Sequence, residues 1–102
     1  MAADRLSRRP EPPHGMDTRL QGNYPRRARV QGVEGRASLR LRILSDGRIG
    51  TMRTLSESPE GWEFADACRR TLEDGGRWER PLGPDGEPVA TDVTYTCRFE
   101  VY

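Results

Sequence analysis

Side chains that bind metals or act as nucleophiles are scarce in this sequence. Its 102 residues include one histidine, His14, and two cysteines, Cys68 and Cys97. A structural zinc site needs four ligands, and His14 lies among prolines and a glycine with no partner at ligand spacing. The serines likewise have no nearby base. We therefore expect a protein that is not an enzyme and that needs no metal and no cofactor.

Long apolar runs and a charge excess are also missing. No stretch is long enough to predict a transmembrane helix, and the first residues lack the apolar core of a secretory signal. We expect no anchor within this chain, which leaves open that it is one domain of a longer protein. Lysine is absent, and 17 arginines against 16 acidic residues give a net charge of +1, which does not favour nucleic-acid binding. With 33% hydrophobic residues, we expect one small core.

The first 22 residues differ in composition from the rest. They are rich in Pro, Arg, Gly and Asp and show neither a helical nor a strand period. We expect a disordered linker or tail over residues 1–22 and a folded domain over residues 23–102. At the start of this domain, Tyr24-Pro25 and residues 26–30 predict a short helical turn, because proline is favoured at the first helical position.

Three segments have the composition of β-strands. Apolar residues alternate with polar ones over residues 37–44, and Asp46-Gly47 then predicts a hairpin turn. The second strand, over residues 48–55, alternates poorly, which indicates a bulge. Residues 89–101 alternate most regularly, with residues 93, 95, 97, 99 and 101 directed inward.

A helix is expected between the second and third strands. Ser58 followed by Pro59 predicts an N-cap and a first helical position, and the helix runs to about residue 73. Its apolar stripe contains Phe64, Cys68 and Leu72. The predicted fold class is α+β: a small antiparallel three-stranded sheet (β-hairpin, α-helix, β-strand) with one helix packed on one face and a short N-terminal helical turn.

The other face of this sheet is expected to be solvated. Arg40 and Arg42 alternate with the apolar residues of the first strand, and the outward residues of the last strand are polar. Charged side chains on an open sheet face discourage aggregation, so we expect these arginines to keep the face soluble.

The two cysteines both point toward the expected core, one from the helix and one from the last strand. This placement makes Cys68 and Cys97 a disulfide candidate that would stabilise a small core by about 2–4 kcal/mol. A disulfide would imply an oxidising compartment. The alternative is a pair of buried free thiols that pack as small apolar groups.

Several short motifs follow one another across residues 21–101. They are Tyr24-Pro25, the Glu34-Gly35 turn, Asp46-Gly47-Arg48, the Ser-x-Ser-Pro stretch before Phe64, and Arg77-Trp78-Glu79-Arg80-Pro81. Each is common by itself, but their order and spacing resemble the C-terminal domain of TonB-type energy transducers.

This resemblance implies a periplasmic domain whose parent protein is anchored in the inner membrane and coupled to a proton-driven motor complex. Domains of this family bind the TonB box, a short extended segment of a TonB-dependent outer-membrane receptor, and transmit force for transport. By analogy the box adds beside the last strand. The implied partner-binding residues are Gln21, Tyr24, Thr94, Thr96, Arg98 and Glu100.

Two other functions are compatible with parts of the sequence. In a structural or scaffold role, the same edge strand would pair with a second copy to form a homodimer, or with another cell-envelope complex. Single-stranded nucleic-acid binding would use the basic strand face, but this face lacks the interleaved aromatic residues that base stacking requires. We expect no nucleic-acid partner.

Overall fold

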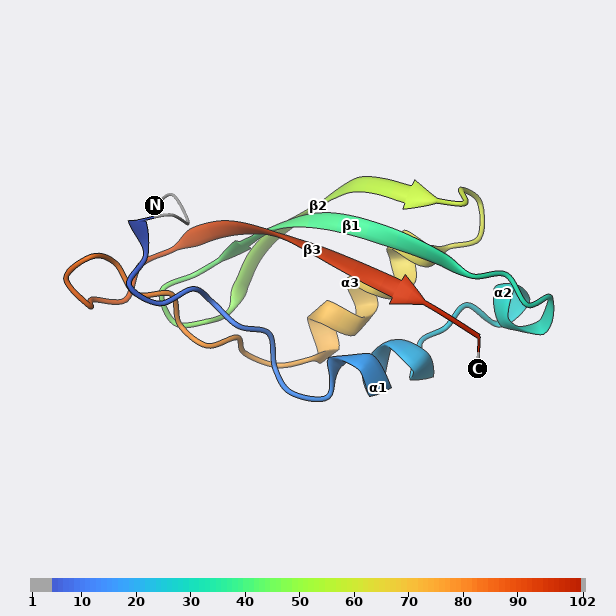
Figure 1. Cartoon of the computed structure of the whole chain (residues 1–102), viewed down its shortest axis with the longest axis horizontal. Helices are drawn as coiled ribbons and strands as arrows, with labels where there is room; N and C mark the ends of the chain where they lie inside the picture. Colours follow the sequence, from blue (N-terminus) through green and yellow to red (C-terminus); the bar gives the residue numbers. More distant parts are fainter. Residues whose placement is uncertain (1–4, 102) are drawn as a thin grey trace.

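The computed structural model describes residues 5–101. In chain order, the elements are α1 (Met16–Gly22), α2 (Arg26–Val30), β1 (Gly35–Ile43), β2 (Ile49–Ser58), α3 (Phe64–Asp74) and β3 (Thr91–Phe99). The strands form one antiparallel sheet in the order β2-β1-β3 (Figure 1). Helix α3 packs across β1 and β2, and α1 packs against α3 and β3. The predicted α+β fold is confirmed, with α1 as an additional helix.

The β1–β2 hairpin forms where the sequence predicts it. The Gly47 N–H donates to the Leu44 carbonyl at 2.9 Å, and Gly47 adopts a φ of 89°, in the left-handed region that favours glycine. The Asp46 carboxylate accepts two hydrogen bonds from Arg48, one from the backbone N–H at 3.1 Å and one from Nε at 2.6 Å. The backbone hydrogen bond is the main reason that the pKa of Asp46 is lowered.

The expected irregularity of β2 is confirmed. The pairing of β1 with β2 shifts register twice, between Ser38 and Leu39 and again between Arg42 and Ile43. Each shift places an extra residue in β2, which bends this strand. Despite the bulges, β2 continues to Ser58, which pairs with Arg36.

This long β2 explains why the predicted helix start is wrong. Ser58 is not an N-cap, because it is the last residue of β2, and α3 begins six residues later at Phe64. Glu63 precedes the helix with a φ of 67°. Pairing with β1 therefore prevails over the local Ser-Pro signal. The helix ends at Asp74, close to the predicted end, and its buried residues include the expected Phe64, Cys68 and Leu72.

The described part of the expected tail is ordered, which corrects the prediction for residues 5–22. Residues 16–22 form α1, in which Met16 and Leu20 are buried. Further upstream, the Ser7 N–H donates to the Leu82 carbonyl at 2.9 Å, and the Leu82 N–H donates to the Arg8 carbonyl at 3.0 Å. The N-terminal part of the expected tail, residues 1–4, lies outside the described residues.

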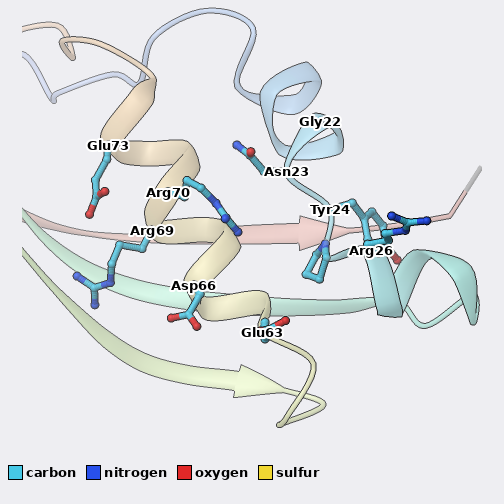
Figure 2. A pocket seen from close by; sticks show the side chains of 10 residues that line it. Gly22, Asn23, Tyr24, Arg26, Glu63, Asp66, Arg69, Arg70 and Glu73 are labelled. Carbon is cyan, nitrogen blue, oxygen red and sulfur yellow. The ribbon is translucent and has the colours of Figure 1, made fainter.

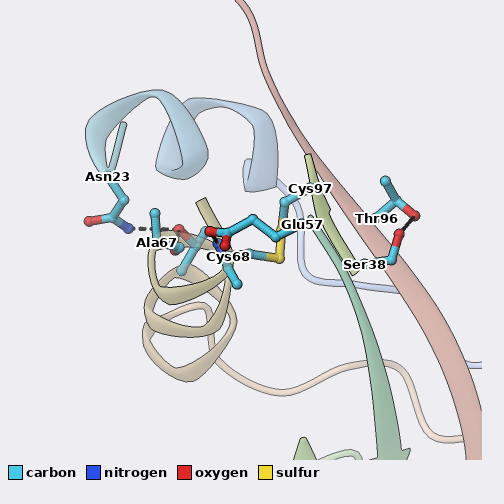
Figure 3. The surroundings of a disulfide bond; sticks show 9 residues. Asn23, Ser38, Glu57, Ala67, Cys68, Thr96 and Cys97 are labelled. Carbon is cyan, nitrogen blue, oxygen red and sulfur yellow. Dashed lines mark hydrogen bonds between the residues drawn. A yellow bond between two sulfur atoms is a disulfide. The ribbon is translucent and has the colours of Figure 1, made fainter. Parts of the chain in front are cut away.

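The core lies between the sheet and the helices. Phe64 of α3 stacks on Phe99 of β3 with ring centroids 5.2 Å apart, and Tyr24 meets both rings edge-on. Cys68 and Cys97 form the predicted disulfide in the same layer, with a Cα–Cα distance of 5.7 Å (Figure 3). Both cysteines are fully buried.

Helices in the described part of the chain are short. Between residues 5 and 101, none combines the length and the apolar character that crossing a bilayer requires.

Candidate functional site

Strand β3 lies at one edge of the sheet. It pairs with β1 along its whole length, from Ile43↔Thr91 to Gly35↔Phe99. On its other side, no strand within residues 5–101 pairs with it. Edge strands expose backbone N–H and C=O groups that an added strand can satisfy, so this edge is the candidate site.

The alternation of β3 fixes which side chains accompany this edge. Val93, Tyr95, Cys97 and Phe99 face the helices, and the residues between them are exposed. Figure 3 shows this division: Cys97 points toward α3, whereas Thr96 lies on the opposite side of the sheet. Burial, followed by the nearby charge of Asp17, raises the pKa of Tyr95.

Among the predicted partner-binding residues, the outward residues of β3 lie together on the open face. The Thr96 hydroxyl shares a 2.8 Å hydrogen bond with that of Ser38, and Thr94 Oγ1 accepts one from Arg40 at 3.1 Å. Arg98 is exposed. Glu100 is exposed too, but it follows the last residue of the strand.

The other two predicted residues come from the N-terminal part of the fold. Gln21 lies half-buried in α1, and its backbone carbonyl accepts a hydrogen bond from Arg29. Tyr24 is only 7% exposed, and its hydroxyl donates to the Val33 carbonyl. Burial is the main cause of its raised pKa. Tyr24 therefore lies beneath the end of β3 and packs against Phe99, so its ring is not on the surface beside Thr96.

A groove follows the first half of this edge and was not foreseen from the sequence. This β3 groove has a volume of about 400 Å³ and is lined by Arg9, Pro10, Pro12, Arg40, Trp78 and residues 92–95. Its lining includes both faces of β3, because Thr94 faces outward and Tyr95 faces the helices. The groove therefore wraps around the free edge, and the N-terminal segment forms its second wall.

The N-terminal wall is held in place by the loop before β3. Arg8 donates to the Arg80 carbonyl from Nε at 3.1 Å and from Nη2 at 2.8 Å, and the Glu79 N–H donates to the Glu11 carbonyl at 2.9 Å. Prolines in this wall have no N–H to donate to β3. Their clustering at positions 10, 12 and 13 is a sequence signal that could have indicated an extended segment, although it was interpreted as part of a disordered tail.

Trp78 lies where the groove meets the core. Its ring meets the Tyr95 ring edge-on at 5.6 Å, and its Nε1 is buried without a hydrogen-bond partner among the described residues. Trp78 was assigned to a family motif in the sequence, but nothing there indicated that it lies beside β3.

A second hollow lies between α3 and the segment that joins α1 to α2 (Figure 2). Its volume is about 590 Å³, and charged residues of both signs line it, including Asp66, Arg69 and Glu73. It offers no histidine, serine or cysteine as a nucleophile. Across residues 5–101, no group of three or more His, Cys, Asp or Glu side chains is placed to hold a metal ion.

Comparison with known proteins gives consistent results. The family described as Gram-negative bacterial TonB protein C-terminal matches residues 21–101. Protein TonB of Klebsiella pneumoniae is 31% identical over 87 residues, which cover 82% of this chain and 31% of that protein. The solution NMR structure of the Pseudomonas aeruginosa TonB C-terminal domain is similar with a TM-score of 0.61 and 33% identity, covering 76% of each chain. This chain thus spans about a third of the length of the curated relative.

Proposed function

This chain belongs to the Gram-negative bacterial TonB protein C-terminal family, and on that premise we propose that it docks an extended peptide of an outer-membrane receptor along β3. The observation that supports this function is the position of β3 at the sheet edge, with β1 on one side and no strand of residues 5–101 on the other. The domain binds a protein partner and catalyses no reaction.

The strength of this docking follows from the length of the edge. About half of the nine residues of β3 direct their backbone groups away from β1. Four to six added hydrogen bonds, at about 0.5–1.5 kcal/mol each, contribute roughly 2–9 kcal/mol before the cost of ordering the peptide. This corresponds to micromolar binding at best unless side chains contribute. The attachment is therefore reversible.

Side chains around the edge add selectivity. Thr94, Thr96 and Arg98 on the open face, together with Glu100, contact alternate side chains of the bound peptide. Gln21 contributes from α1, which packs against β3. Tyr24 acts from below, by supporting Phe99 at the end of the strand. The β3 groove guides the peptide past residues 92–95, because its proline wall offers few competing donors.

The energy for transport is proposed to come from further parts of a larger parent protein. We propose that it is anchored in the inner membrane, coupled to a proton-driven motor complex, and that this domain lies in the periplasm and transmits force to the receptor. The Cys68–Cys97 disulfide supports the placement, since disulfides persist in oxidising compartments such as the periplasm.

Alternately N-methylated peptides test one-sided strand pairing. Two isomers of a receptor-derived peptide of about nine residues, the length of β3, are each N-methylated on alternate residues and titrated into the ¹⁵N-labelled chain. One isomer loses the N–H groups that face β3 and should not bind, whereas the other should bind and shift the amide signals of β3. Equal binding of both isomers, or shifts confined to α3, would contradict strand addition.

The scaffold function is separated from peptide docking by the same samples. If the edge instead pairs two copies of the chain, light scattering shows a dimer whose population rises with concentration and is unaffected by the unmodified peptide. For a docking domain, we expect the peptide to bind the monomer, or to dissociate any dimer formed through β3.

A further inference from the structure

The open face of the sheet carries a concentration of arginine that the net charge of +1 conceals. Four cross-strand rows on this face contain only Arg, Ser, Thr and Asp. The arginines are Arg36, Arg40, Arg42, Arg53 and Arg98, and all five are exposed. Asp92 is the one carboxylate in these rows, with Glu100 just beyond the end of β3.

Two pairs of these arginines are directly opposed. Arg36 pairs with Arg98 across β1 and β3, and Arg40 pairs with Arg53 across β1 and β2. Like charges directly opposite each other destabilise a sheet. The ion pair found on this face within residues 5–101 joins Arg42 to Asp92 at 3.1 Å, and Arg40 donates to a neutral threonine hydroxyl. Within residues 5–101, no ion pair involves Arg36, Arg40, Arg53 or Arg98. Glu34 and Glu100 line the same hollow as Arg36 and Arg98, so the uncompensated charge is concentrated around Arg40, Arg42 and Arg53.

The face is also hollowed where three of the arginines meet. A depression of about 450 Å³ is lined by Arg40, Arg42 and Arg53, together with Thr51 and Asp92. Guanidinium groups form paired hydrogen bonds with phosphate oxygens, and the threonine hydroxyl is a further donor. The hollow thus has the chemistry of a phosphate site.

We propose that this arginine face binds the phosphate headgroups of an anionic lipid bilayer. The arginines of β1 alone extend over about 20 Å, since Arg36 and Arg42 are six residues apart at about 3.4 Å per residue. One small anion cannot reach all of them, whereas a planar array of headgroups can. No aromatic ring lies in the cross-strand rows to stack on bases, and no apolar side chain there would insert into the bilayer. Binding is therefore superficial and electrostatic.

This proposal does not require peptide docking, but Arg40 and Arg98 of the face also lie beside the proposed peptide path. It gives the domain a second surface that would keep it close to a membrane while the edge remains available. Arg98 belongs to both the face and the predicted peptide site. Peptide binding by the face variant is therefore measured separately, with the titration described above.

Vesicle sedimentation of the full chain tests the proposal. The chain is mixed with phosphatidylcholine vesicles with and without phosphatidylglycerol at low ionic strength. The face variant carries Arg36→Gln, Arg40→Gln, Arg53→Gln and Arg98→Gln. The matched control carries Arg26→Gln, Arg70→Gln, Arg77→Gln and Arg80→Gln, which remove the same charge from exposed positions outside the rows. Circular dichroism verifies that both variants are folded.

We expect the unmutated chain to bind only the anionic vesicles, with an affinity that falls as the salt concentration rises. Each arginine near an anionic surface contributes about a fivefold change in partitioning, so the face variant should lose on the order of a hundredfold or more. The control should lose much less. Equal losses in the two variants would overturn the proposal, as would complete displacement by millimolar inorganic phosphate or tighter binding to duplex DNA than to vesicles.

Discussion

Breaking the Cys68–Cys97 disulfide is expected to lower the free energy of unfolding by about 3.6 kcal/mol. The bond closes a loop of the chain between residues 29 positions apart, and the chain-entropy relation converts that loop length into this value at 25 °C. For a domain of this size, each 1 kcal/mol corresponds to about 4–8 °C in the melting temperature, so the expected decrease is about 15–30 °C.

Urea unfolding of the unmutated chain, once oxidised and once reduced, measures this contribution without any substitution. The double variant Cys68→Ala/Cys97→Ala is the control, because its stability should not respond to reductant. It should also be less stable than the reduced chain, since both positions are fully buried and alanine leaves space. A difference below about 1 kcal/mol between oxidised and reduced chain would refute the reasoning, because the loop would then contribute little to the unfolded ensemble.

Three further predictions concern the turn and the core. Gly47→Ala should destabilise the fold by more than about 1 kcal/mol, because its Cβ would lie 2.2 Å from the Trp78 carbonyl oxygen. Gly86 has a similar φ but open space around it, so Gly86→Ala should cost only about 1 kcal/mol of backbone strain. Thermal melts of the two variants make the comparison. Asp46→Asn should flatten the loss of stability in acid. In the folded chain the pKa of the Asp46 carboxyl is lowered from 3.8, so this carboxylate stabilises the fold above that value, and the stabilisation disappears as pH falls through the folded pKa. Identical pH profiles of melting temperature for the unmodified chain and Asp46→Asn would contradict this. Phe99→Ala should cost about 3–5 kcal/mol in urea unfolding, because the ring is fully buried between two aromatic neighbours, and a loss below 1 kcal/mol would show that the cluster can collapse around the gap.

The parts of the fold that were predictable have strong local patterns. The regular alternation of β3 identified the strand, its inward face and the cysteine that faces α3. The Asp46-Gly47 turn was predictable for the same reason, because a glycine in the left-handed region favours one kind of connection. Together these two features define most of the sheet.

The parts that were not predictable depend on contacts between distant segments. Met16 and Leu20 stand in a polar stretch and make α1 stable only because α3 and β3 cover them. The Ser58 signal for a helix start is local, and pairing with Arg36 prevails over it. For the candidate site, the edge position of β3 was expected, but the groove beside Trp78 forms only when the N-terminal segment pairs with the loop around Leu82.

The covalent link between α3 and β3 also restricts how two copies of this chain can associate. Domain swapping requires a strand to leave its own molecule and take the same place in another. With Cys97 bonded to Cys68, β3 cannot be traded alone, because it would carry α3 with it. In the oxidised chain, exchange of β3 by itself is therefore blocked, and it becomes accessible once the bond is reduced.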